Sequence, residues 1–246
     1  MDASGSHDAN RQYYDAFSHG YETHRGDNDP GGYHDLLDEL EADYVARFGR
    51  DGDVLEVGCG TGLVLQRIER FARSAQGVDL SPGMLEKARE RGLKVVEGSA
   101  TELPFEDRQF DVTCSFKVLA HVPEIERALS EMARVTRPGG TVLAEFYNPF
   151  SWRGLAKRFA PAGRVAEGTH EDHVYTRFDT PLGVRRLVPH NMQIVGSRGI
   201  RVATPAARLM RVPALRNVLA TTERVLCDSP LRFFGGFFVV AMRRTH

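Results

Sequence analysis

A chain of 246 residues in which 41% of the side chains are hydrophobic and 26% are charged has the size and composition of one large globular domain. No apolar run approaches the ~20 residues that cross a bilayer, so no membrane-spanning helix is expected. The formal charge of −1 conceals an asymmetry, because residues 1–146 hold 27 acidic and 16 basic side chains, whereas residues 147–246 hold 6 acidic and 16 basic. Either the second half binds an acidic ligand, or its basic residues only solvate helix faces.

The first ten residues and the three cysteines bear on location and metal content. Residues 1–10 are polar and acidic, without the basic start and apolar stretch of a signal peptide, which predicts a cytoplasmic location.

The three cysteines, Cys59, Cys114 and Cys227, are scattered and match neither a disulfide framework nor a metal-binding pattern. We interpret them as small buried residues and predict no metal site.

The regular elements of the first 147 residues predict an α/β sheet. A glycine-rich loop at 26–32 separates an N-terminal helical segment from a helix over 34–48. After Gly52, short apolar runs alternate with helical stretches, as in a parallel sheet. The predicted strands are 54–57, 74–79, 94–97, 110–116 and 141–147. The predicted helices are 62–71, 82–91 with Ser81 as N-cap, and 125–136, the last of which ends at Pro138-Gly139-Gly140.

Beyond Tyr147 the pattern becomes less regular. Residues 152–159 and 181–187 read as short helices, and residues 193–202 and 234–243 read as two further strands. The segment 204–232 between those strands is too long for a hairpin and is predicted to be a helical insertion. Because the run from Phe234 to Val240 is too apolar for an exposed edge, this last strand is expected inside the sheet.

The most informative segment is Val54-Leu55-Glu56-Val57-Gly58-Cys59-Gly60-Thr61-Gly62. A buried strand ends in an acidic residue, and a glycine-rich turn then opens a helix whose amide groups can meet a ligand. The dinucleotide fingerprint Gly-x-Gly-x-x-Gly needs a third glycine where this chain has Leu63. A carboxylate at Glu56 also sits poorly beside a pyrophosphate but suits a ligand that carries an ammonium group.

This segment resembles the glycine-rich loop of class I S-adenosylmethionine-dependent methyltransferases, close to their menaquinone/ubiquinone-methyltransferase-like branch. The resemblance spans residues 51–147 and implies a Rossmann-like, seven-stranded, mostly parallel sheet with helices on both faces. It also implies S-adenosyl-L-methionine as cofactor and a single domain with an N-terminal helical lid (1–50), a cofactor-binding core (51–147) and substrate-side extensions with the helical insertion (148–246). The further matching motifs are Val78-Asp79-Leu80-Ser81-Pro82-Gly83-Met84-Leu85, Gly98-Ser99-Ala100, Leu103-Pro104-Phe105, Phe110-Asp111-Val112, Val118-Leu119-Ala120-His121-Val122 and Arg137-Pro138-Gly139-Gly140.

The resemblance assigns expected roles to the residues of these motifs. The turn with Glu56, Gly58, Cys59 and Gly60 should hold the methionine portion of the cofactor, and Asp79 should accept hydrogen bonds from both ribose hydroxyls. Where the family usually has Gly-Asp-Ala, this chain has Gly-Ser-Ala, so Glu102 or backbone atoms are expected to share the adenine contact. The remaining expected contacts are Leu80 and Met84 on the adenine face, Ser99 and Ala100 at its edge, and the Phe116 carbonyl to the ammonium group.

Two further regions are expected at the site. The N-terminal segment around Tyr21 and Arg25 resembles a lid that reaches the cofactor carboxylate, although packed tyrosines of an amphipathic helix would look the same. His121 falls where the family often has histidine, so it is either a general base or a residue that shapes the pocket. Weaker histidine candidates are His34, His170 and His173.

Three functions remain open from the sequence. The first is methylation of a small molecule that is anionic and partly apolar. The sequence defines neither the acceptor atom (O, N or C) nor the oligomeric state of the protein. The second is methylation of RNA or protein docked on the basic half, but no RNA-binding module or dense Lys/Arg run is present, so no nucleic-acid partner is expected. The third is a non-catalytic, cofactor-binding regulator. Arginines at 153, 177, 201, 208 and 211 are the expected anion ligands.

Overall fold

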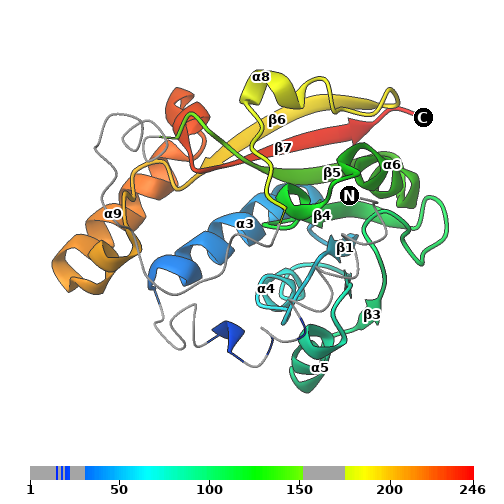
Figure 1. The fold of residues 1–246 in the computed structure, drawn as a ribbon, viewed down its shortest axis with the longest axis horizontal. Coiled ribbons are helices and arrows are strands. Elements are labelled where there is room, and N and C mark those ends of the chain that lie inside the picture. Colours follow the sequence, from blue (N-terminus) through cyan, green and yellow to red (C-terminus); the bar gives the residue numbers. More distant parts are fainter. Residues whose placement is uncertain (1–14, 16–17, 19, 23–30, 152–174) are drawn as a thin grey trace.

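The computed structural model describes residues 15, 18, 20–22, 31–151 and 175–246, so the predicted helix over 152–159 lies outside the described residues. A seven-stranded sheet runs through the molecule (Figure 1). Its strands are β1 (Asp53–Val57), β2 (Ser74–Asp79), β3 (Val95–Glu97), β4 (Phe110–Ser115), β5 (Thr136–Tyr147), β6 (Met192–Ile200) and β7 (Phe237–Arg244).

The strand order is β3-β2-β1-β4-β5-β7-β6. The first five strands are parallel, and β7 runs antiparallel to both β5 and β6. The predicted mostly parallel sheet is therefore confirmed, as is the internal position of the apolar last strand. Because the chain leaves β1 toward β2 and β3 and then returns to β4 on the other side, β1 and β4 flank the point where ligands of open α/β sheets bind.

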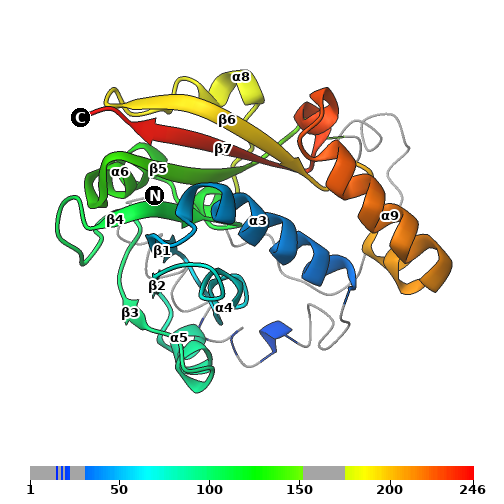
Figure 2. The same cartoon turned by 180° about the vertical axis from the view of Figure 1, so that it is seen from behind.

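Helices cover both faces of the sheet, as the alternation of side chains along each strand requires (Figures 1 and 2). In β7, Val239 and Ala241 join the core beneath α3 (Tyr33–Gly49), α4 (Leu65–Ile68) and α5 (Pro82–Glu90). Phe238, Val240 and Met242 join the core beneath α6 (Ile125–Val135), η1 (Leu119–His121) and α8 (Pro181–Val184). None of the described helices is long and apolar enough to cross a membrane.

Two predicted elements differ from the structure. The helix expected over 62–71 is reduced to the single turn of α4, because Gly62 still belongs to the glycine turn, with φ +84° and its amide bonded to the Cys59 carbonyl. No loop separates α6 from β5, which begins at Thr136 and includes the Pro-Gly-Gly run. The pairing of β5 with β4 shifts register between Phe110 and Val112, which accommodates a proline that has no amide hydrogen to donate.

The insertion between β6 and β7 is helical, as predicted. It forms η3 (Ala207–Arg211), α9 (Pro213–Leu226) and η4 (Pro230–Phe234). Met210 is fully buried in the core that α3 also joins, and Leu219 packs against that core. The buried carboxylate of Glu223 accepts the amide hydrogens of residues 202–204. The sequence further predicts that residues 201–232 form a helical cover over the site of methyl transfer. The insertion instead packs beside α3, and no residue of 201–232 lines the pocket at the glycine turn.

Arg198 of β6 is a buried ionic anchor for the insertion. Its side chain is 1% exposed and donates to both carboxylate oxygens of Asp228, at 3.0 and 2.8 Å, and to Asp43 at 2.8 Å. The guanidinium carbon also lies 4.8 Å from the ring centroid of Tyr44. Burial opposes ionisation of Asp228, but the hydrogen bonds from Arg198 and Arg47 outweigh it and lower the pKa of Asp228 to about 2.

We expect Arg198→Met to lower the free energy of unfolding by about 1.5–3 kcal/mol, because Asp228 loses two hydrogen bonds from a buried guanidinium group but keeps Arg47 as a partner. Urea denaturation measures the change, and Arg243→Met, on the exposed side of the neighbouring strand, is the matched control. Because the folded-state pKa of Asp228 is depressed, the wild type should lose this stabilisation as the pH falls from about 4 toward 2. Equal stability of the two variants would contradict the anchor.

Candidate active site

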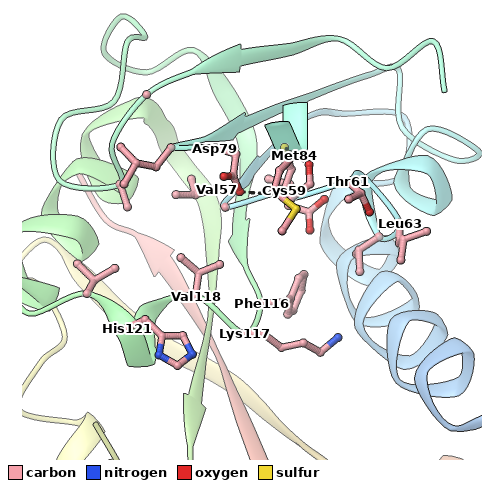
Figure 3. A pocket seen from close by; sticks show the side chains of 18 of the residues that line it. Val57, Cys59, Thr61, Leu63, Asp79, Met84, Phe116, Lys117, Val118 and His121 are labelled. Atoms are coloured by element: carbon pink, nitrogen blue, oxygen red, sulfur yellow. Dashed lines mark hydrogen bonds between the residues drawn. The ribbon is translucent and has the colours of Figure 1, made fainter. Parts of the chain in front are cut away.

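A pocket opens at the carboxyl ends of β1 and β2 and beside the segment that follows β4 (Figure 3). The cofactor-binding residues expected from the matched motifs, together with Tyr21 and His121, all line this pocket, whereas Arg25 lies outside the described residues. Sequence reasoning missed several others: some are direct neighbours of predicted residues, and Glu41 and Lys117 reach the pocket only because α3 and the segment after β4 fold back onto β1. The missed lining residues are Glu41, Val57, Thr61, Leu63, Val64, Gly98, Lys117, Val118 and Val122.

The glycine turn is held against β2 and β4. The amides of Gly58 and Cys59 both donate to the carbonyl of Val78, at 2.7 and 3.1 Å. Gly58 has φ +74°, and a Cβ atom there would lie 2.2 Å from Cγ2 of Val118. Gly60 has φ +53°, and no described atom lies within 4 Å of the position that a Cβ atom would take there. The turn is therefore open to a ligand on that side.

We expect Gly58→Ala to destabilise the protein and to weaken ligand binding in the pocket. The substitution combines a left-handed backbone, which costs about 1–2 kcal/mol for a residue with a Cβ atom, with a clash against a buried neighbour. Gly92→Ala separates the two effects, since Gly92 has φ +79° but nothing within 4 Å of the Cβ position. Thermal denaturation should show a larger loss for Gly58→Ala than for Gly92→Ala. Equal losses would show that backbone strain alone matters.

Asp79 closes β2 and faces the glycine turn. Its Oδ2 accepts the Gly60 amide at 2.8 Å, and its Oδ1 accepts the Ser81 amide at 2.9 Å (Figure 3). Enclosure by the protein raises the pKa of this carboxyl, although the amide hydrogen bonds oppose the rise. Each carboxylate oxygen has two lone pairs, so both can accept a further hydrogen bond from a ligand in the pocket.

The side of the pocket near α5 is apolar. Met84 is 3% exposed, and Leu80 and Ala100 lie beside it in the lining. Ser99 hydrogen-bonds Thr101 through the two hydroxyls at 2.8 Å, which holds the turn that replaces the usual Gly-Asp-Ala motif. The side chain of Glu102 is 85% exposed and does not line the pocket, so the expectation that Glu102 shares the adenine contact is not met.

The described part of the N-terminal segment is fastened to α5. Oδ1 of Asp15 accepts hydrogen bonds from the Ser81 hydroxyl at 2.6 Å and from the Gly83 amide at 3.1 Å. Arg91 donates to both carboxylate oxygens of Glu22 at 2.8 Å. Tyr21, next to Glu22, lines the pocket. The described part of this segment therefore lies beside the pocket, a lid stays a prediction, and Asp15 and Glu22 make contacts that the sequence did not reveal.

Carboxylates gather on the α3 side of the pocket. Glu56 is 3% exposed, and its Oε2 has no hydrogen-bond partner among the described residues. Glu41 of α3 lies in the same lining, and its carboxylate is 2.7 Å from the Nζ of Lys117. Burial raises the pKa of Glu56 well above its usual range, and the charges of Glu41 and Asp38 raise it further. The pocket therefore favours a positively charged group at this end.

His121 stands at the opposite end of the pocket, in η1. Its Nδ1 lies 3.0 Å from the Tyr175 carbonyl oxygen, and its ring meets the ring of Tyr147 edge-on at 5.7 Å. A carbonyl only accepts, so Nδ1 carries the proton and Nε2 is the accepting nitrogen of the neutral ring. Further aromatic rings surround Tyr147, with Phe178 at 6.1 Å and Phe237 at 5.2 Å.

The other candidates lie elsewhere or are already paired. His34 belongs to α3 and does not line the pocket, and His170, His173 and Arg153 lie outside the described residues. Arg177 makes two hydrogen bonds to Asp179, both at 2.8 Å. None of the described arginines lines the pocket. The three cysteines are buried free thiols, which confirms their interpretation as small buried residues.

Comparison with known proteins matches the residues that build this pocket. Residues 55–144 match the family described as Methyltransferase domain. Over 107 residues the chain is 43% identical to a demethylmenaquinone methyltransferase of Mycobacterium marinum, a match that covers 43% of this chain and 46% of the relative. It is 44% identical over 102 residues to a phosphatidylethanolamine N-methyltransferase of Cereibacter sphaeroides, covering 38% and 50% of the two chains. The chain thus spans about half the length of these relatives.

Solved structures share the fold over most of the chain. A possible histamine N-methyltransferase from Thermotoga maritima matches with a TM-score of 0.59 and 20% identity, covering 85% of this chain and 91% of its own. The [4+2]-cyclase SpnF matches with a TM-score of 0.62 and 20% identity, covering 95% of both chains. Because one of these proteins is a cyclase, the fold alone does not establish the reaction. The family match and the glycine turn do identify residues 55–144 as a methyltransferase domain.

Proposed function

We propose that this chain transfers a methyl group from S-adenosylmethionine to a small, partly apolar acceptor that is anionic when it reacts. The observation that carries the proposal is the polarity of one pocket. Buried carboxylates lie at the end formed by α3 and β1, whereas the imidazole of His121 lines the other end, with the ring of Tyr147 behind it. The first end suits the cationic methionine portion of the cofactor, and the second suits an acceptor with an acidic hydroxyl group.

The residues present fit this cofactor. Glu56 has a buried oxygen without a partner among the described residues, which an ammonium group would satisfy. Gly60 leaves open space where any other residue would place a Cβ atom. Asp79 keeps accepting capacity for the ribose hydroxyls, and Leu80 and Met84 offer an apolar surface to the adenine.

The protein's own work is to align the acceptor and to remove its proton. When bound, S-adenosylmethionine supplies an electrophilic methyl group, so the difficult chemistry belongs to the cofactor. His121 would take the acceptor's hydroxyl proton on Nε2, while the Tyr175 carbonyl holds the ring in the matching tautomer. Val118 and Val122 provide apolar walls beside it and exclude water from the reacting pair.

Among anionic acceptors we favour an acidic phenol over a carboxylate or a phosphate. A permanent anion would need a cationic partner, but none of the described arginines lines the pocket, and Lys117, which does line it, is paired with Asp38 and Glu41. The lining beside His121 is apolar, with Val118 and Val122, and the ring of Tyr147 packs against His121, so this end suits a flat apolar acceptor instead. The names of the relatives, demethylmenaquinone methyltransferase and phosphatidylethanolamine N-methyltransferase, support a small-molecule acceptor.

The test compares acceptor classes with labelled cofactor. Purified protein is incubated with S-adenosylmethionine carrying a labelled methyl group and with a small-molecule extract, bulk RNA or bulk protein. We expect label in small molecules, and phenols better methylated than their non-ionisable ethers or neutral analogues. Label in RNA or protein alone would support a macromolecular substrate. Binding of the cofactor without transfer to any class would indicate a regulator, and preference for a cationic amine would contradict an anionic acceptor.

We further propose that the protein acts in the cytoplasm and without a nucleic-acid partner. The first statement keeps the location expected from the sequence. The second is supported by the distribution of arginines such as Arg198 and Arg244, which the fold uses internally. Cell fractionation with an antibody tests the location, and a gel-shift assay with bulk RNA tests the partner.

A further inference from the structure

Four carboxyl groups and one ammonium group are enclosed together beside the pocket. We call Asp38, Glu41, Glu56, Glu145 and Lys117 the Lys117 cluster. The four acidic residues are 2%, 0%, 3% and 1% exposed in that order. They meet because Glu56 of β1 and Glu145 of β5 point to the face that α3 covers, and α3 contributes Asp38 and Glu41. Among these five groups the acids outnumber the ammonium group by four to one.

The geometry gives the single ammonium group to the two acids of α3. The Nζ of Lys117 lies 2.9 Å from Asp38 Oδ1 and 2.9 Å from Glu41 Oε2. Figure 3 shows the Lys117 side chain extending toward α3. The Lys117 amide donates to Glu145 Oε1 at 3.0 Å from a left-handed backbone with φ +61°. Glu56 and Glu145 each keep one buried oxygen without a hydrogen-bond partner among the described residues.

The surroundings of Glu56 and Glu145 favour their neutral forms. Burial is the largest cause that raises the pKa of both groups, followed by the charge of Glu41, and Lys117 opposes the rise. Asp79 at the end of β2 raises the pKa of Glu56 further. The thiols facing the cluster are Cys59 and Cys114, and burial raises their pKa as well, so they add no charge near neutral pH.

We propose that the Lys117 cluster is a proton-linked cation site, in which Glu56 exchanges its proton for the ammonium group of the bound cofactor. The inference rests on the proposed function, because it takes S-adenosylmethionine as the ligand. The O–H bond of Glu56 breaks, the proton leaves to solvent, and the carboxylate pairs with the ammonium group. Glu41 and Asp38 do not belong to the glycine turn, but their charges raise the pKa of Glu56 in the empty pocket.

The consequence is a cofactor affinity that depends on pH with a defined sign. In the empty pocket Glu56 holds its proton, and with the ammonium group beside it the ionised form is favoured. Between the two corresponding pKa values, binding releases a proton, so affinity rises with pH and then levels off. A carboxylate that was already ionised would release no proton and would give a flat profile.

Isothermal titration calorimetry counts the protons directly. The full chain is titrated with S-adenosylmethionine at a series of pH values, in pairs of buffers such as phosphate and Tris whose ionisation enthalpies differ widely. We expect the wild type to release protons on binding, up to about one per cofactor, between the two pKa values of Glu56. Glu56→Gln, which cannot ionise, should release almost none and bind at least ~10-fold more weakly. Glu41→Gln should move the pH of half-maximal release downward, because an ionised neighbour of Glu56 is gone.

Glu39→Gln is the matched control, since Glu39 is on the same helix with its side chain 54% exposed and paired with Arg224. It should behave as the wild type does. Binding with equal enthalpy in both buffers of every pair would overturn the inference and leave the proposed function standing. An unchanged pH of release in Glu41→Gln would also overturn it, because Glu56 alone would then explain the protons. Absence of any cofactor binding by the wild type would overturn both proposals.

Discussion

Replacing His121 with alanine is expected to lower turnover by about 10²–10⁴-fold, the usual contribution of a positioned general base. The imidazole lies at the acceptor end of the pocket, with Nδ1 bonded to the Tyr175 carbonyl and Nε2 left as the accepting nitrogen. Asp79, which we assign to the cofactor, belongs to a different strand end. Steady-state kinetics should therefore show a lower kcat, whereas calorimetry should show nearly unchanged affinity for the cofactor.

Two comparisons separate proton removal from mere shaping of the pocket. His121→Gln keeps a polar side chain of similar length but cannot act as a general base, so most of the turnover should be lost. His34→Ala, on α3 and outside the pocket lining, should retain full activity. If His121→Gln keeps the wild-type rate and pH profile, His121 only shapes the pocket.

Asp79→Ala is expected to weaken S-adenosylmethionine binding by at least ~10-fold, which corresponds to only ~1.4 kcal/mol. The expected loss is a lower bound, because two charge-assisted hydrogen bonds to the ribose hydroxyls would each contribute about 1.5–3 kcal/mol. The variant also removes the acceptors of the Gly60 and Ser81 amides, so the glycine turn loses its side-chain hydrogen bond to the end of β2. Calorimetry on the folded variant measures the affinity.

Asp79→Asn provides the matched control, because it keeps the shape and one accepting oxygen but removes the charge. We expect an intermediate affinity. The pH dependence has a defined sign, since enclosure raises the pKa of Asp79 in the free protein. Protonation at low pH replaces an acceptor with a donor, so wild-type affinity should fall as the pH drops through that pKa, and Asp79→Ala should lack this component. Unchanged affinity in folded Asp79→Ala would remove the assignment of this acid.

Local sequence determined most of the parallel half of the sheet. The strand that ends at Asp79 and the N-cap at Ser81 were predicted at their observed positions, because apolar runs, a capping hydroxyl and a following proline act within a few residues of one another. The glycine turn was recognisable for the same reason, since positive φ angles at Gly58 and Gly60 favour glycine wherever the chain folds. Pattern alone also placed the last strand inside the sheet.

Tertiary structure decided what depends on contacts between distant segments. The sequence around Glu41 reads as an ordinary helix, and only the packing of α3 on the sheet brings its carboxylate to Lys117, 76 residues later. In the same way the basic balance of the second half suggested anion ligands, but Arg198 and Arg177 bind carboxylates of the protein itself. Charge counted along a chain cannot distinguish a group that faces a ligand from one that faces its own fold, because that choice is made by burial and by partners far away in the sequence.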